Sequence, residues 1–86
     1  MSTHYIVQSA SAQMPASCRG RYMRVAVLEV PAGVERATMI SDRARDVVRV
    51  VETWERLSVG LTERCAYRRA LAAAKALAAK LNAVAL

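Results

Sequence analysis

The sequence has few of the residues that metal sites, redox sites and phosphate-binding loops require. It contains one histidine, His4, and two cysteines, Cys18 and Cys65, which do not form a Cys-x-x-Cys pair. A structural zinc site needs four such ligands, so we expect no bound metal and no cofactor, and we expect both cysteines to be inert thiols. The three glycines are isolated from one another, which excludes a glycine-rich loop that would cradle a phosphate.

Long hydrophobic runs are also missing. The most apolar stretch, residues 70–86, is interrupted by Lys75 and Lys80, whereas a membrane-spanning helix needs about 20 predominantly apolar residues in succession. The first eight residues lack the basic and apolar regions of a secretory signal. These patterns predict a cytoplasmic protein with no membrane contact, which would lie in the cytoplasm of the host cell if a phage encodes it.

Aromatic residues make up only 5% of the chain. The sequence also shows no pairing of a nucleophile with a histidine and no pair of carboxylates that would indicate catalysis. Hydrophobic residues account for 55% and charged residues for 23% of the 86 residues, which predicts one folded domain over residues 1–86. A chain of this length buries only about 60–65% of its unfolded surface, so there is little room for an enclosed substrate cavity. His4 lies near a terminus that we expect to fray, without a nucleophile as partner. The sequence therefore indicates a protein that is not an enzyme.

Three strands are predicted in the first half of the chain. Residues 5–9 form a short β-branched stretch, followed by a loop that contains Pro15. Residues 21–30 have the clearest strand composition, and Pro31-Ala32-Gly33 has the composition of a tight turn. Residues 34–40 would then return as the third strand of an antiparallel sheet. Both faces of the second strand are partly apolar, so the sequence leaves open which face meets the helices.

Two helices are predicted in the second half. Ser41 is a favoured N-cap, and apolar residues at three- and four-residue spacing predict a helix over residues 42–58 with Trp54 in the core. Thr62 would cap a second helix over residues 63–84, which is rich in alanine, the best helix former. The apolar stripe of this last helix consists of Tyr67, Ala70, Leu71, Ala74, Leu77, Ala78, Leu81 and Ala85.

This order of elements predicts an α+β fold. We expect a three-stranded antiparallel sheet followed by two helices in a two-layer sandwich, with strands within about residues 4–40 and helices at about 42–58 and 63–84. The alanine stripe permits close helix packing within the chain, and it permits a homodimer equally well.

Positive charge is concentrated in the last helix. The chain has 13 Lys and Arg against 7 Asp and Glu, a net charge of +6, and residues 64–86 contain no acidic side chain. Helical spacing places Arg64, Arg68 and Lys75 together beside the apolar stripe. A second basic cluster begins the second strand. The residues predicted to bind a partner are Arg19, Arg21, Tyr22, Arg24, Arg64, Arg68, Arg69, Lys75 and Lys80.

Two segments resemble the small phage-encoded anti-CRISPR proteins. Residues 22–29 read Tyr-Met-Arg-Val-Ala-Val-Leu-Glu, and residues 52–54 read Glu-Thr-Trp. The resemblance implies an antiparallel sheet ahead of two helices. It also implies a non-enzymatic inhibitor that binds a type I CRISPR effector complex and blocks target DNA or nuclease recruitment, with Tyr22 as a contact. The chain departs from the acidic DNA mimics among these proteins by its positive charge.

The sequence therefore favours a non-enzymatic binding protein, an inhibitor from a phage or mobile element that docks on a host protein or ribonucleoprotein complex. The alternative is a basic DNA- or RNA-binding protein that uses the Arg and Lys residues of the last helix and the strand start at Arg19–Arg24. A purely solvated basic face, which keeps an alanine-rich helix soluble, also stays open at this point.

Overall fold

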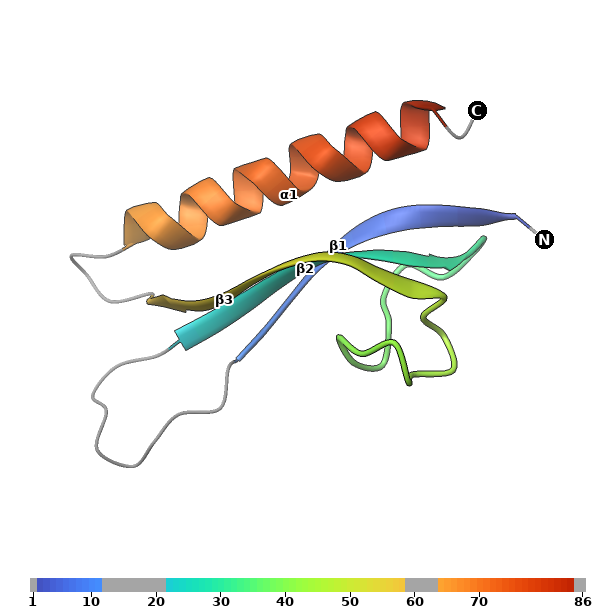
Figure 1. Ribbon diagram of the computed structural model, residues 1–86, viewed down its shortest axis with the longest axis horizontal. Coiled ribbons are helices and arrows are strands. Elements are labelled where there is room, and N and C mark those ends of the chain that lie inside the picture. Colours follow the sequence, from blue (N-terminus) through green and yellow to red (C-terminus); the bar gives the residue numbers. More distant parts are fainter. Residues whose placement is uncertain (1, 12–21, 59–63, 85–86) are drawn as a thin grey trace.

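The protein folds into a three-stranded antiparallel sheet with one helix along one of its faces (Figure 1). The computed structural model describes residues 2–11, 22–58 and 64–84. The elements in chain order are β1 (Thr3–Ser11), β2 (Tyr22–Pro31), β3 (Arg49–Ser58) and α1 (Arg64–Val84). The α+β class, the first two strands and the last helix that the sequence predicts are confirmed.

Strand β2 lies at the centre of the sheet and pairs with β1 on one side and β3 on the other. Its residues Val25, Ala26, Val27, Leu28 and Val30 are completely buried. Successive side chains of a strand point to opposite faces, so a central strand covered on both faces must be apolar without interruption. This explains why both faces of β2 looked apolar in the sequence.

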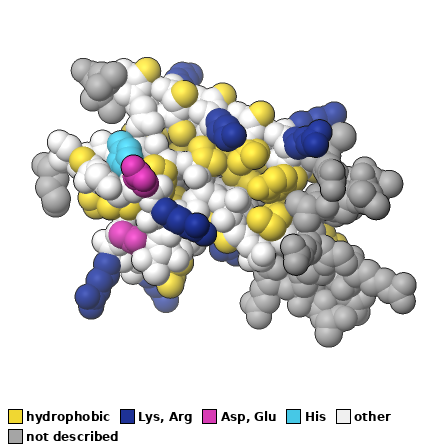
Figure 2. Space-filling model, turned by 180° about the vertical axis from the view of Figure 1, so that it is seen from behind, with side chains coloured by type: hydrophobic (Ala, Val, Ile, Leu, Met, Phe, Trp, Pro, Cys, Tyr) yellow, Lys and Arg dark blue, Asp and Glu magenta, His cyan; other side chains and the backbone are white. Residues whose placement is uncertain are grey.

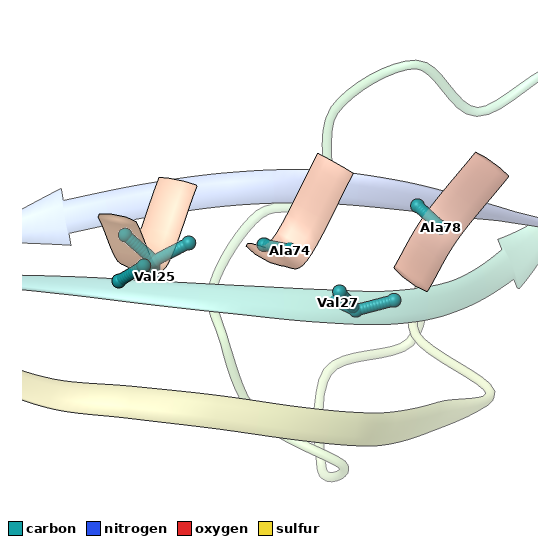
Figure 3. Packing of buried hydrophobic residues seen from close by; sticks show 5 residues of the cluster. Val25, Val27, Ala74 and Ala78 are labelled. Carbon is teal, nitrogen blue, oxygen red and sulfur yellow. The ribbon is translucent and has the colours of Figure 1, made fainter. Parts of the chain in front are cut away.

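Helix α1 covers the face that carries Val25 and Val27. These valines pack against Ala70, Ala74 and Ala78 of the helix (Figure 3). Three alanines in a row along the contact let the helix backbone approach the sheet closely, because a methyl group occupies little space between the two layers. The apolar stripe predicted for this helix is confirmed, apart from Ala85, which lies outside the described residues.

The opposite face of the sheet is covered by the irregular segment 32–48, which lies on the far side from α1 (Figure 1). Ala37 and Val47 of this segment are buried against Leu28 and its neighbours on β2. The Gln8 side chain of β1 holds the segment with two hydrogen bonds. Gln8 Nε2 donates to the carbonyl of Ala37 at 2.9 Å, and Gln8 Oε1 accepts from the N–H of Ala37 at 2.8 Å.

The predicted strand over residues 34–40 is wrong. The turn at Pro31–Val34 is present, since the Val34 N–H donates to the Pro31 carbonyl at 3.1 Å. Gly33 has a φ of 94°, a backbone angle that residues other than glycine rarely adopt. Beyond this turn the chain crosses the face of the sheet and packs there, instead of returning along β2 as an edge strand.

The predicted helix over residues 42–58 is also wrong, because residues 49–58 form strand β3. Two register shifts against β2 insert extra residues into β3. As a result, Val51, Trp54 and Leu57 all pack against the helix-side cluster at three-residue intervals. This spacing imitates a helical stripe in the sequence. Ser41 does cap a turn, but a single one, since its Oγ accepts from the Arg43 N–H at 3.1 Å.

The two-layer sandwich of a sheet and two helices is therefore corrected. One face of the sheet meets one helix, and the other meets a segment without regular structure. Segment 32–48, part of which was predicted to belong to the helix over residues 42–58, covers the face of the sheet opposite α1. Among the described elements, the surfaces that remain uncovered are the outer side of α1 and the two edges of the sheet.

Candidate functional site

Four basic side chains of α1 form the first candidate site, which we call the cationic helix face. Arg68, Arg69, Lys75 and Lys80 are all exposed. The helix contains no Asp or Glu. The ion pairs found in the described residues join strand side chains instead, with Arg24 Nε 3.3 Å from Glu55 Oε1 and Arg49 Nε 3.3 Å from Glu29 Oε1. The positive charge of the helix is therefore directed at solvent.

The arrangement of charge along α1 is unfavourable for the helix itself. Its first turn contains no acidic residue and its last turn contains no basic one. The N-terminus of a helix carries a partial positive charge, which attracts anions and repels cations. Arg68 and Arg69 lie in the second turn, beyond the first turn in which this partial charge acts. The lack of acidic residues within α1, and not the helix dipole, therefore leaves their charge unbalanced.

The cationic helix face has two sides. Arg68, Lys75 and Asn82 recur at seven-residue intervals, so they share one side of the helix. Asn82 is fixed to strand β1, since its Oδ1 accepts from the Tyr5 N–H at 2.8 Å and its Nδ2 donates to the Tyr5 carbonyl at 2.9 Å. Arg68 and Lys75 therefore lie along the outer edge of β1, as Arg69 and Lys80 do not.

The remaining predicted partner-binding residues are not part of this surface. Arg24 alternates with Val25 on β2 and so points to the face opposite α1, where its pairing with Glu55 engages its charge. Tyr22 is half-buried at the start of the same strand, paired with β3 at Ser58. Arg19, Arg21 and the side chain of Arg64 lie outside the described residues.

The outer edge of β1 is a second candidate site, which the sequence analysis missed. The Ala32 N–H donates to the Ser2 carbonyl at 3.0 Å, so the even-numbered residues of β1 bond to β2. In an antiparallel pair the intervening residues point their N–H and C=O groups away from the partner. Asn82 satisfies both groups of Tyr5. At Val7 and Ser9, no described residue of the chain forms a hydrogen bond with these outward groups.

Two adjoining hollows follow this edge, and we call them together the β1 edge groove. One, of about 290 Å³, is bordered by Val7, Gln8, Ser9, Glu35 and Arg36. The other, of about 710 Å³, extends along Ser9–Ser11 to Arg24 and residues 36–41. Figure 2 shows basic side chains on the helix above a band of hydrophobic side chains on this side of the molecule. The groove is lined by β1, β2 and segment 32–48 and by no residue of α1, while Arg68 and Lys75 stand on the helix side of the same strand edge.

Two titratable side chains on the side of the sheet covered by segment 32–48, His4 and Asp46, form hydrogen bonds within the fold. His4 lies within β1, and its Nε2 is 2.6 Å from the carbonyl of Val34, which corrects the expectation that it lies at a frayed terminus. Asp46 Oδ2 accepts from the Thr38 Oγ1 at 2.8 Å and the Thr38 N–H at 2.7 Å. These hydrogen bonds, the one from the Thr38 side chain first, lower the pKa of Asp46.

Among the described side chains, no three from His, Cys, Asp and Glu stand close enough together to hold a metal ion. Cys18 and the side chain of Cys65 lie outside the described residues. In the described ranges, α1 included, no helix combines the length and the apolar character needed to cross a lipid bilayer.

The fold and these two surfaces define an α+β protein with a cationic helix and an open sheet edge. Comparison of the chain with models of protein families, with curated proteins and with solved structures gave no match. The function is therefore argued from the surfaces alone.

Proposed function

We propose that this chain is a non-enzymatic binding protein that docks through the cationic helix face on an acidic surface of a protein or ribonucleoprotein complex. The observation that carries the proposal is the exposure of four basic side chains on a helix without an acidic residue. Complementary charge steers two macromolecules together and fixes their orientation.

The way the sheet is covered supports the same proposal. Because α1 and segment 32–48 cover the two faces of the sheet, the apolar side chains of β2 are buried in the core and cannot contact a partner. The cationic helix face thus remains exposed and available for a partner. Its arginines provide planar, multidentate donors, and its lysines provide point charges, which together suit carboxylates and phosphates.

The resemblance of residues 22–29 and 52–54 to anti-CRISPR proteins suggests one particular partner. A type I CRISPR effector complex binds nucleic acid and lies in the cytoplasm, where an inhibitor of this size would act. Within this hypothesis the cationic helix face, and not Tyr22, is the principal contact, because Tyr22 is half-buried. Residues 52–54 belong to β3, where Trp54 packs against the core and so stabilises the fold.

Direct binding of DNA or RNA is the second candidate function. The same absence of acidic residues from α1 favours it, because phosphates would meet no repulsion along the helix. If the four basic residues each neutralise one duplex phosphate, the logarithm of the affinity should fall with the logarithm of the salt concentration with a slope of about −3 to −4. A protein partner would give no retention on purified duplex or single strands at low salt.

The test compares two double variants with the same change in net charge. Arg68→Glu/Lys75→Glu alters the cationic helix face, whereas Arg43→Glu/Arg45→Glu alters two exposed arginines on segment 32–48. Each tagged protein is used to capture partners from a lysate that contains a type I effector complex, with and without nuclease. The proposal predicts nuclease-resistant capture that the first variant loses and the second keeps.

A gel-shift assay with the purified effector complex and its target DNA then tests the suggested partner. Inhibition of DNA binding by the wild type and by Arg43→Glu/Arg45→Glu, but not by Arg68→Glu/Lys75→Glu, is the expected result. Equal capture by both double variants would reject the cationic helix face as the docking surface. Capture that disappears after nuclease treatment would contradict docking on a protein surface and would support direct binding of nucleic acid.

A further inference from the structure

We infer that the β1 edge groove binds an extended acidic segment of the partner, which adds to the sheet as a fourth strand beside β1. The inference rests on the proposed function and specifies how the partner is held. Its first support is the backbone of Val7 and Ser9, whose outward N–H and C=O groups have no hydrogen-bond partner among the described residues. Such groups on an edge strand are a template for another strand.

The hydrogen bonds of Tyr5 with Asn82 close the beginning of this edge and leave the rest open. Asn82 satisfies the Tyr5 N–H and C=O with its side-chain amide, so the beginning of β1 cannot accept another strand there. Tyr67 Oη donates to Ser9 Oγ at 3.4 Å and Asn82 bonds Tyr5, so the intervening Lys75 of α1 lies along the stretch of β1 around Val7, and its side chain is exposed. The edge therefore opens where the helix provides a positive charge instead of an amide.

The charge beside the groove selects the occupant. On the helix side of the edge stand Arg68 and Lys75, and no acidic residue of α1 accompanies them. A strand added to β1 points alternate side chains toward α1, so glutamate or aspartate at alternate positions would meet these two residues. On the other side Arg36 and Glu35 border the groove together, which provides no net preference for either charge.

A second copy of this chain is a poor occupant of the same edge. Pairing of β1 with β1 across a two-fold axis would bring the Arg68 and Lys75 side chains of both copies to one seam. Each copy also carries a net charge of +6. Like charges at a shared interface oppose association, whereas an acidic strand neutralises them.

Amide hydrogen exchange at individual residues tests the inference. The probe is an eight-residue peptide that alternates Glu and Val, and its control is the same peptide N-methylated at every residue. N-methylation keeps the charge but removes the hydrogen-bond donors that a strand needs. We expect the Glu-Val peptide to slow exchange of the Val7 and Ser9 amides at least about tenfold at saturation, as pairing protects an open edge. The N-methylated peptide should leave both amides unprotected.

Two double variants with the same change in net charge test which basic residues attract the peptide. We expect Arg68→Glu/Lys75→Glu to weaken binding of the Glu-Val peptide about tenfold, because two attractive surface contacts become repulsive. Arg43→Glu/Arg45→Glu changes the net charge equally at two exposed arginines of segment 32–48, away from α1, and it should change the affinity less than about twofold.

Failure of this inference is distinguishable from failure of the proposed function. If the peptide binds but exchange at Val7 and Ser9 stays fast, the strand addition is refuted and docking on the cationic helix face remains. Slowing of these amides with protein concentration alone would identify a second copy as the occupant and overturn the acidic segment. If the two double variants bind the peptide equally, the charge argument is refuted.

Discussion

At the scale of single residues, two carboxamide side chains do much of the fastening. Gln8 bonds both the N–H and the C=O of Ala37, and Asn82 bonds both groups of Tyr5. A carboxamide is the side chain that can donate and accept through neighbouring atoms, so it can replace the missing strand partner of one residue. Gln8 thereby attaches segment 32–48 to β1, and Asn82 attaches the end of α1 to it.

Replacement of Gln8 tests this fastening. Gln8→Ala leaves the N–H and C=O of the buried Ala37 without these partners, so we expect a loss of about 1–3 kcal/mol in the free energy of unfolding. Gln8→Glu keeps an acceptor for the Ala37 N–H but turns a carboxylate oxygen toward the Ala37 carbonyl, so it should not restore the stability of the wild type. Urea denaturation measures both variants, and an unchanged midpoint for Gln8→Ala would show that the segment is held by its apolar contacts alone.

Asp46 should make the stability depend on pH in acid. Hydrogen bonds from Thr38 lower its pKa below the ordinary value of 3.8, so its carboxylate stabilises the folded state when the pH is above that value. This stabilisation is lost as the pH falls through the lowered pKa. Asp46→Asn should therefore be less stable than the wild type at pH 7, and the difference should disappear near pH 2.

Urea midpoints at the two pH values measure this effect. Asp42→Asn provides the control, because Asp42 is an exposed carboxylate nearby that forms no hydrogen bond within the described parts of the chain. A difference between the wild type and Asp46→Asn that persists unchanged into acid would contradict the assignment of the effect to the carboxylate.

At the scale of elements, the helix and the sheet meet through alanine. Ala74 is completely buried between them and lies beside Val25 and Val27 in the helix-side cluster. Ala74→Leu adds volume that this contact cannot accept without separating the layers, so we expect a cost of about 1–3 kcal/mol. Ala76→Leu, an exposed position of the same helix, should cost less than about 0.5 kcal/mol. Equal stability of the two variants in thermal denaturation would show that the layers separate without cost.

The elements also differ in how well the sequence predicted them. Helix α1 and strand β2 were predictable because propensity and pattern agree in each: alanine at helical spacing in one, an unbroken run of β-formers in the other. Strand β3 was not, because its bulges place Val51, Trp54 and Leu57 on one face at a helical interval. The dense β-branched residues of this region, Val47 and Val48 just before the strand and Val50, Val51 and Thr53 within it, were the signal that should have outweighed the spacing.

The two parts of the candidate site show the same contrast. The exposure of Lys75 and Lys80 follows from their places outside the apolar stripe, so the sequence predicts it. The β1 edge groove depends on which strand ends at an edge and on the pairing of Asn82 with Tyr5, contacts between residues 77 positions apart. No local pattern encodes such a contact, and the groove becomes visible only when the strands are assembled.

At the scale of the whole molecule, the positive charge lowers the stability of the fold while it attracts an anionic partner. The net charge of +6 repels itself in the compact state, and the described basic residues of α1 have no acidic neighbour on their helix to relieve it. A surface selected for stability alone would contain acidic residues in the first turn of this helix. Their absence is consistent with retention of the positive charge for a partner.

This conflict leads to a prediction about salt. Because added salt screens the repulsion between like charges, the wild type should become more stable, by about 0.5 kcal/mol, between 10 mM and 150 mM NaCl. Arg68→Glu/Lys75→Glu should be at least as stable as the wild type at 10 mM and should respond less to salt, although it loses the partner. Thermal denaturation at the two salt concentrations measures both proteins. If the double variant were less stable than the wild type at low salt, Arg68 and Lys75 would contribute to folding, and their exposure on α1 would no longer argue for a docking surface.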